Sequence, residues 1–336
     1  MIEAEILKSI LNDDHELANF IWKNNKDEVK KILKKTRLKD YFLRLTLSTE
    51  DESPTEIYQY LKEKRFTQRV KENFIKDLSS DLRSCGVEHI VFKGSIFSKL
   101  YYAQLTDRVY SDFDILIKNN SYASLYNYLN KKNYKHYDNY RYIGRTGFCR
   151  TALEVIDTDF GAIDIHHRIF SKFYRKTCPL TEHAFFNLKI TDDISHTTDE
   201  INLCIVLYHA FKQDQMKLDP YFLVDFDRIL KSPDLCKNKL STYLNNYGLE
   251  DSYRYCLDVL DKMNSRNYIP KKIFDMPRRN NISFTNFGLK TQVHHFIDPL
   301  PYMRIQTGSD KFSYIDFLKI KFGKLFFEIK CKEKKF

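Results

Sequence analysis

The sequence predicts an α+β fold, in which a small mixed β-sheet with flanking helices is preceded by a helical segment and followed by a mainly helical domain. Residues 1–86 have helical periodicity, short apolar runs typical of strands begin at residue 87, and helical periodicity returns after about residue 190. We therefore expect an N-terminal helical segment (1–86), an α+β core (87–190) and a C-terminal mainly helical domain (191–336).

The N-terminal segment is expected to form two or so amphipathic helices up to Arg44 and then one longer helix. A polar break at 48–54 separates them and ends in residues that favour a helix start. Periodicity predicts the longer helix from Glu56 to Arg83, and Gly86 supplies its stop signal.

The core is expected to alternate strands and helices. The expected strands are 87–92, 112–117, 153–156 and 162–169, and the expected helices are 95–102 and 121–130. TDFG (158–161) supplies turn residues for a hairpin between the last two strands. Its DFG also occurs in protein kinases, but no glycine-rich loop, VAIK lysine or HRD loop accompanies it, so we interpret it as a turn.

The C-terminal part is expected to be helical at 200–213, at 221–231 and within 243–263. Its last stretch, KIKFGKLFFEIKCKEKK (319–335), interleaves aromatic residues with seven lysines. Such a segment can contact nucleic acid or an anionic membrane. The simpler interpretation is a terminal helix that packs its aromatics inward and keeps a solvated basic face.

Composition limits the class of protein. With 43% hydrophobic and 15% aromatic residues, the chain is expected to be globular, and it has no apolar run long enough to span a membrane and no signal peptide. The seven cysteines form no CxxC pair, so neither a disulfide framework nor a zinc site is supported and a cytoplasmic protein with reduced thiols is expected. The net charge of +10 indicates either an anionic partner or a biased genome composition, and both interpretations stay open.

Most of the candidate phosphate-binding and metal-binding residues lie between Ile90 and Ile117. A Lys93-Gly94-Ser95 turn follows a short apolar strand, and Asp112 and Asp114 stand at the start of the next strand. Glycine allows backbone amides to approach a phosphate closely. Residues two apart on a strand point the same way, so the two carboxylates could share a cation.

Two further residues extend this pattern. Arg108 lies four residues before Asp112, where it could steer a phosphate or pair with the carboxylates. Asp164 lies between apolar residues on a later expected strand, where an unpaired charge would be costly. Three carboxylates on adjacent strands could hold two Mg²⁺ ions.

These motifs resemble those of the nucleotidyltransferase (DNA polymerase β-like) superfamily, and within it a bacterial family of uncharacterised nucleotidyltransferases. The resemblance is specific in KGSIFSKLYYAQLTDRVYSDFDILI and AIDIHHRIF, and looser in INLCIVLYHAFKQDQMKLDPYFLVDFDRILK and FIDPLPYMRI (296–305). It spans about residues 69–324 and implies a nucleotidyltransferase-type mixed sheet.

The resemblance also implies roles for individual residues. It implies metal binding and catalysis by Asp112, Asp114 and Asp164, with Asp164 helping to deprotonate the acceptor, and nucleotide binding by Lys93, Gly94, Ser95 and Arg108. The implied cofactors are two Mg²⁺ ions and an NTP donor, of which ATP is the preferred candidate.

Other matching positions have open roles. His166 is either a core-packing or a catalytic residue, and His209, Lys212, Asp225 and Asp227 either line an acceptor or base pocket or form a structural polar cluster. Ser111, Ser95 and His167 depart from the residues usual in the family, but no departure removes a carboxylate.

The resemblance therefore implies transfer of a nucleoside monophosphate from an NTP to an acceptor. The sequence leaves the acceptor open among a small molecule, a sugar phosphate, a peptide or protein and tRNA. A non-catalytic nucleotide- or partner-binding module and an RNA-directed nucleotidyltransferase are the alternatives. Nucleic acid is a permitted partner rather than a required one.

Overall fold

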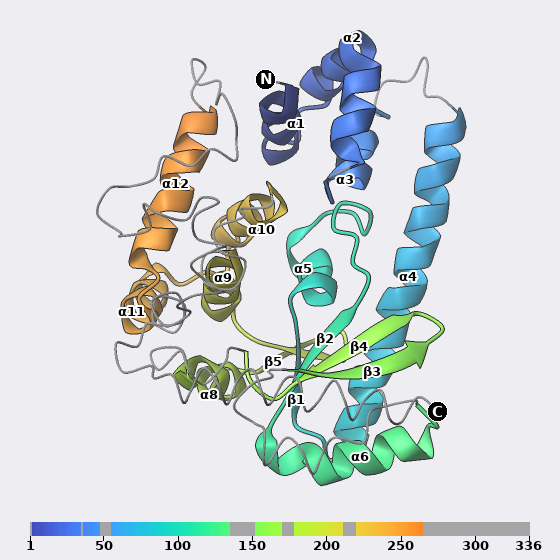
Figure 1. The fold of residues 1–336 in the computed structure, drawn as a ribbon. Coiled ribbons are helices and arrows are strands. Elements are labelled where there is room, and N and C mark those ends of the chain that lie inside the picture. The colour runs from blue at the N-terminus through green and yellow to red at the C-terminus, as the bar shows by residue number, and fades with distance from the viewer. Residues whose placement is uncertain are drawn as a thin grey trace, which may run out of the picture.

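A four-stranded mixed β-sheet lies at the centre of the computed structural model, with helices on both of its sides (Figure 1). The structure describes residues 2–34, 36–47, 55–134, 152–169, 178–210 and 220–264. The α+β class expected from the sequence is confirmed. Some sequence expectations fall outside the described residues, namely the break at 48–54, Lys212, and the segments 296–305 and 319–335.

The central sheet is built from strands β1 (His89–Phe92), β2 (Phe113–Ile117), β3 (Ala152–Thr158) and β4 (Gly161–His166). Their order in the sheet is β1-β2-β4-β3. β2 and β4 pair in parallel at the centre, whereas β1 and β3 pair antiparallel with them at the two sides. All the residues of β1 and β2 are buried, which explains why both strands are continuous apolar runs interrupted only by His89 and Asp114.

The hairpin predicted at TDFG is confirmed. β3 and β4 pair antiparallel around a turn at Asp159 and Phe160, and Gly161 follows with φ of +136°. A Cβ atom at Gly161 would lie 2.5 Å from the backbone oxygen of Ser111, so the close approach of the hairpin to that residue requires glycine. Strand β4 ends at His166, three residues earlier than the expected end at Ile169.

The N-terminal segment is helical, as expected, and its helices are α1 (Ile2–Leu11), α2 (His15–Leu33), α3 (Lys39–Leu45) and α4 (Thr55–Ser84). α2 is kinked at Asn25, where the backbone leaves the helical region. α4 ends at the predicted stop signal. Gly86 has φ of +73°, and the Val87 amide donates to the Leu82 carbonyl at 2.9 Å, as in a glycine-terminated helix.

The remaining helices are α5 (Gly94–Tyr101), the 3₁₀ helix η1 (Asn119–Ser121), α6 (Tyr122–Lys131), α8 (Cys178–Phe186), α9 (Asp199–Tyr208), α10 (Pro220–Leu230), α11 (Lys237–Tyr247) and α12 (Glu250–Asn264). A second antiparallel hairpin is formed by β5 (Lys189–Thr191) and β6 (Ile194–His196). Neither α8 nor this hairpin was expected from the sequence. The boundary expected between residues 190 and 191 falls inside β5.

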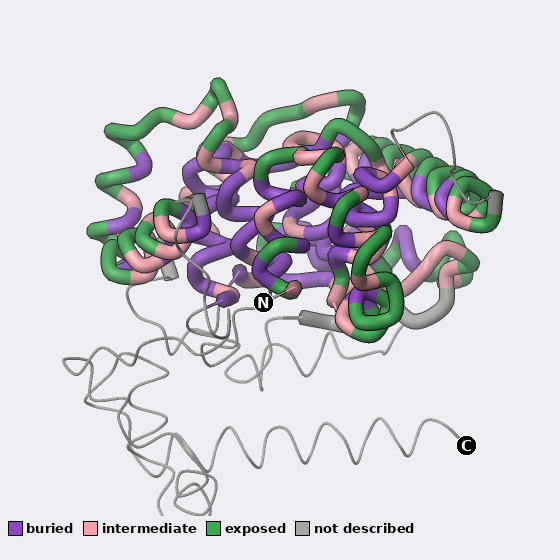
Figure 2. Tube along the Cα trace, turned by 90° about the horizontal axis from the view of Figure 1, so that it is seen from above, coloured by how far each residue is buried: buried purple, intermediate pink, exposed green. Residues whose placement is uncertain are grey.

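One continuous apolar core contains residues from all three expected parts of the chain, for example Ile10, Ile115 and Val224. α5 packs on β1 and β2, α4 packs on β1, and α10 contacts both α5 and α1. Figure 2 shows the buried segments gathered in the middle of the molecule, with exposed stretches on the outer turns of the helices.

Charged side chains also join the N-terminal helices to the rest. Arg228 on α10 donates to the Ile10 carbonyl and to the Asp13 carboxylate, each at 2.9 Å. Arg44 on α3 pairs with Asp107, whose side chain is only 1% exposed. Burial raises the pKa of Asp107 to about 6, although Arg44 acts in the opposite direction. Burial therefore outweighs the single ion pair at this carboxylate.

The structure bears on two expectations from composition. No helix among the described residues combines the length and the apolar character needed to cross a membrane. The cysteines for which side-chain surroundings are described, Cys85, Cys204, Cys236 and Cys256, are all free thiols.

Candidate active site

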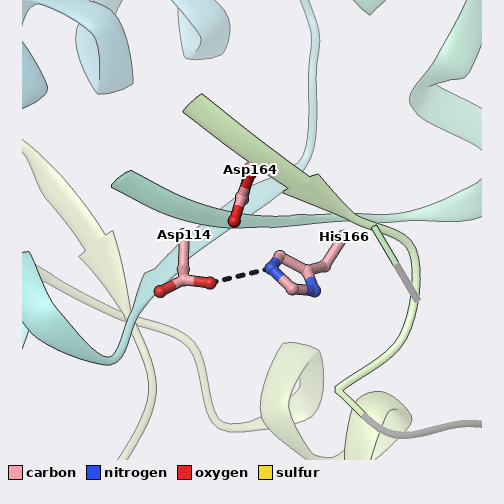
Figure 3. A group of neighbouring side chains, drawn as sticks. All are labelled: Asp114, Asp164 and His166. Carbon is pink, nitrogen blue, oxygen red and sulfur yellow. Dashed lines mark hydrogen bonds and ion pairs between the residues drawn. The ribbon is translucent and has the colours of Figure 1, made fainter. Parts of the chain in front are cut away.

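Two aspartates face each other at the centre of the sheet. Asp114 on β2 and Asp164 on β4 are direct partners in the parallel register, so both side chains project from the same face. Asp114 is buried and Asp164 is half-buried. Figure 3 shows their carboxylates converging with the ring of His166, which lies two residues beyond Asp164 on the same strand.

Two basic groups surround the carboxylate of Asp114. The Lys93 ammonium lies 3.0 Å from Asp114 Oδ1, and His166 Nε2 lies 2.8 Å from the same oxygen. Burial by itself would raise the pKa of Asp114, but Lys93 and His166 outweigh it and hold the pKa well below its usual range. Burial lowers the pKa of His166, although Asp114 acts in the opposite direction. At neutral pH Asp114 is therefore an anion.

The Lys-Gly-Ser turn lies directly beside this carboxylate. Lys93 adopts φ of +60° and ψ of −132°, an unfavourable region for a residue with a side chain, and α5 starts at Gly94. A Cβ atom at Gly94 would lie 3.0 Å from Tyr110 Cβ, so a larger residue would press on Tyr110. The Ser95 hydroxyl is buried and has no hydrogen-bond partner among the described residues. Such an orphaned group at a helix N-terminus fits an anionic ligand.

Asp112 stands apart from the other two aspartates. It precedes β2, is half-buried, and accepts a weak hydrogen bond of 3.3 Å from the Ser111 hydroxyl. It is not a member of the group in which the ligand atoms of Asp114, Asp164 and His166 all lie within 4.8 Å of one another. The structure thus brings together two of the three predicted carboxylates, with a histidine as the third group.

Lys71 on α4 is a residue that the sequence analysis missed. Its ammonium donates to the Tyr110 carbonyl at 3.0 Å. Burial lowers the pKa of Lys71, and the charge of Asp112 acts in the opposite direction. In the sequence Lys71 is one of many lysines on a helix, so no signal could have set it apart.

Arg108 pairs with a carboxylate of the helical side, Asp225. Its guanidinium forms a bidentate pair with Asp225 on α10, with Nε to Oδ1 and Nη2 to Oδ2 both at 2.9 Å. The Tyr102 hydroxyl donates to Asp225 Oδ1 at 2.6 Å, and the guanidinium lies 3.8 Å from the centre of the Tyr221 ring. Arg108 and Asp225, each singled out separately from the sequence, therefore form one buried cluster that joins the loop after α5 to α10.

The other residues of the helical side have distinct surroundings. The His209 ring stacks on Phe222 with ring centres 6.0 Å apart. Asp227 pairs with Lys231 at 2.8 Å.

The arrangement offers an anion-binding turn next to a pair of carboxylates. Like charges that face each other in a partly buried place repel, and Lys93 pairs with the Asp114 carboxylate at 3.0 Å. The donor set of two carboxylates and one imidazole fits a divalent cation, which would neutralise both carboxylates. The site therefore suits chemistry on a phosphorylated ligand that carries a metal.

Comparison with known proteins identifies a family for this chain. The family described as "Uncharacterised nucleotidyltransferase" matches residues 23–264, a range that contains every site residue described above. Among solved structures, the chain is similar to an antigenic nucleotidyltransferase-like protein from Paracoccidioides brasiliensis, with 13% sequence identity and a TM-score of 0.34. That match covers 55% of this chain and 91% of the other. No curated protein matches the chain.

Proposed function

This chain belongs to the family of uncharacterised nucleotidyltransferases, and from that premise we propose that it transfers a nucleoside monophosphate from an NTP to an acceptor nucleophile, with release of pyrophosphate. The observation that carries the proposal is the pair Asp114 and Asp164, which face each other on parallel strands beside the Lys93 turn. ATP is the preferred donor, and the acceptor is a small molecule, a sugar phosphate, a peptide or protein, or tRNA.

The turn and the start of α5 would bind the triphosphate. The first amides of α5 and the Ser95 hydroxyl would donate hydrogen bonds to phosphate oxygens, and the helix dipole would favour their negative charge. Lys93 would contribute its ammonium from the opposite end of the turn. Gly94 would let the phosphate approach the backbone closely. A Cβ at this position would also lie only 3.0 Å from Tyr110 Cβ.

Asp114 and Asp164, with Asp112 as the further ligand that the family resemblance implies, would hold two Mg²⁺ ions. When bound, these ions supply positive charge to the triphosphate and activate the attacking oxygen. Asp114 is strongly ionised, which suits a ligand and not a proton acceptor. Asp164 is less buried, and in this proposal it accepts the proton of the acceptor hydroxyl or amine.

The helical side would contribute the acceptor or base pocket. His209 is retained as a candidate for it, together with Lys212, because both match positions of the family in the sequence. The contacts of Asp225 with Arg108 and Tyr102 favour a structural role for Asp225 and Arg108. In that role they would fix α5, and with it the phosphate-binding turn, against α10.

The proposal is tested by incubating the full chain with each α-labelled NTP, Mg²⁺ and cell extract, and measuring both label transfer and pyrophosphate release. We expect transfer by the wild type and a loss of about 1000-fold or more in Asp114→Asn and Asp164→Asn. Asp258→Asn, a change of an exposed carboxylate on α12, is the matched control and should transfer normally.

Two outcomes would contradict the proposal, and a third would narrow it. Full activity in Asp114→Asn would show that the site is wrong. Tight NTP binding with no pyrophosphate release under any condition would identify a non-catalytic nucleotide-binding module. Label found in RNA ends, with RNA binding that falls steeply with salt, would replace the broad acceptor list with an RNA-directed enzyme.

A further inference from the structure

His166 is held in one orientation against the two central aspartates. It is the last residue of β4, two positions after Asp164, so strand alternation sends both side chains to the same face. Across the parallel pair, His166 is opposite Leu116, which is two positions after Asp114 on β2. The ring of Phe92 meets the imidazole edge to face, with ring centres 4.9 Å apart. The strand and this aromatic contact together fix the ring, which Figure 3 shows turned toward the Asp114 carboxylate.

The spacing of the donor atoms suits coordination of one ion. His166 Nε2 and Asp114 Oδ1 are 2.8 Å apart. With metal–ligand bonds of about 2.1 Å, neighbouring ligands of an octahedral ion lie roughly 3 Å apart and opposite ligands roughly 4.2 Å apart. The donor atoms of Asp114, Asp164 and His166 all lie within 4.8 Å of one another, so small side-chain rotations would bring them to one cation.

A positive charge is already present at this place. The Lys93 ammonium contacts the same Asp114 oxygen as His166, at 3.0 Å. Its long stem lets the ammonium swing away, whereas the aspartates and His166 are fixed on adjacent strands. Binding of a metal ion at Asp114 would therefore replace the contact to Lys93 and release the ammonium toward the phosphate-binding turn.

We propose that His166 is a direct ligand of the divalent ion, so that Asp114, Asp164 and His166 form a mixed oxygen–nitrogen site which prefers Mn²⁺ or a similar transition-metal ion over Mg²⁺. Mg²⁺ is bound in proteins almost entirely through oxygen, whereas imidazole suits transition-metal ions. In the metal-free structure Nε2 lies 2.8 Å from the ionised Asp114 carboxylate, so a neutral ring carries its proton there. On metal binding the Nε2 lone pair becomes the ligand and the proton moves to Nδ1, which is buried and has no hydrogen-bond partner among the described residues. The inference rests on the proposed function for the use of a metal, and it changes which ion is used.

The decisive measurement is pulsed electron paramagnetic resonance of Mn²⁺ bound to the full wild-type chain without nucleotide. A directly coordinated imidazole nitrogen gives a ¹⁴N modulation, which a histidine outside the coordination sphere does not give at this strength. We expect that modulation in the wild type. Mn²⁺ bound with water and oxygen ligands alone would overturn the proposal.

Variants test the preference between ions. His166→Gln is expected to lose about 10–100-fold in Mn²⁺ affinity with a smaller change for Mg²⁺, and His166→Asp, which restores a full oxygen set, is expected to shift the preference toward Mg²⁺. His183→Gln on α8, whose ring contacts Tyr243 and Tyr247, is the control histidine. Unchanged Mn²⁺ affinity in a folded His166→Gln would contradict the proposal.

The two proposals can fail separately. Nucleotide transfer that requires Asp114 together with a Mn²⁺ spectrum free of nitrogen would keep the proposed function and reject His166 as a ligand. A nitrogen-coordinated Mn²⁺ together with no transfer from any NTP would keep the metal site and reject the proposed function.

Discussion

Asp114 and Asp225 are both buried carboxylates, but their neighbours neutralise them in different ways. Asp225 is bound through both oxygens by the rigid guanidinium of Arg108 and accepts a further hydrogen bond from Tyr102. Asp114 receives the flexible ammonium of Lys93 and the ring of His166 on the same oxygen, and a second acid faces it across the sheet. The first cluster is closed, in the sense that both oxygens of Asp225 are paired with Arg108. In the second cluster the proposed metal ion would replace Lys93 at Asp114.

The largest effect on stability is expected at the closed cluster. Arg108→Ala leaves Asp225 buried without its partner, and the free energy of unfolding should fall by about 3–5 kcal/mol in a denaturant titration. Asp225→Ala added to Arg108→Ala should cost much less than the sum of the two single changes. Lys262→Ala, which removes an exposed ion pair to Asp258, is the control and should cost less than about 1 kcal/mol. A loss near that control value for Arg108→Ala would remove the distinction between the clusters.

The next effect is expected at the hairpin that carries Asp164. Gly161→Ala combines an unfavourable φ with a Cβ that would lie 2.5 Å from the Ser111 carbonyl oxygen, so we expect a loss of about 3 kcal/mol and a weaker metal site. Gly86→Ala is the matched control, because Gly86 also has positive φ but has no atom within 4 Å of the added methyl group. Its cost should be about 1 kcal/mol. Equal costs would show that contact with Ser111 is unimportant.

Asp107 is an intermediate case, with one ion pair to Arg44 and with Oδ2 buried and unpartnered among the described residues. Its pKa is raised from 3.8 to about 6, so the folded state binds more protons between these values. The resulting stabilisation is fully present below pH 3.8 and is lost as the pH rises through 6.

Between pH 4 and pH 7 this group should lower the free energy of unfolding by about 2 kcal/mol. Asp107→Asn should therefore show a flatter dependence on pH in urea titrations. An identical pH profile in both proteins would mean that Arg44 neutralises Asp107 as completely as Arg108 neutralises Asp225.

The smallest effect concerns the backbone of Lys93. Lys93→Gly and Lys93→Ala both remove the ammonium from Asp114, but only glycine relieves the positive φ. The glycine variant should therefore be more stable than the alanine variant by about 1 kcal/mol, and both should bind NTP more weakly than the wild type. Equal melting temperatures for the two variants would show that this turn is unstrained.

The sequence predicted the elements of the site better than their pairing. The change of period at residue 87 located the sheet, and the Lys-Gly-Ser turn, β2 and β4 lie close to their expected positions. The alignment of Asp114 with Asp164 depends on strand register, which is set by packing between distant segments. Asp112 is outside the cluster because β2 begins only at Phe113. α8 has no clear apolar face, and β5 and β6 have three residues each, which is too short for a periodic signal.

The contact of Arg108 with Asp225 also could not be predicted from the sequence. Both residues were singled out, but 117 positions separate them in the chain, and a side chain that can bind phosphate can equally bind a carboxylate. Likewise, the sequence left His166 between a packing and a catalytic role, because nothing in the sequence indicates that its Nε2 lies 2.8 Å from Asp114.

The continuous core has a practical consequence for dissecting this molecule. Because Ile10, Ile115 and Val224 belong to one apolar cluster, cutting the chain at residue 87 or 190 would expose surfaces that normally bury each other. Fragments made at those positions would be prone to aggregate, and a minimal catalytic unit would have to keep α1 to α12 together. Insertions and fusion tags are better placed in exposed turns away from the site, such as the one at Lys132 and Asn133 after α6.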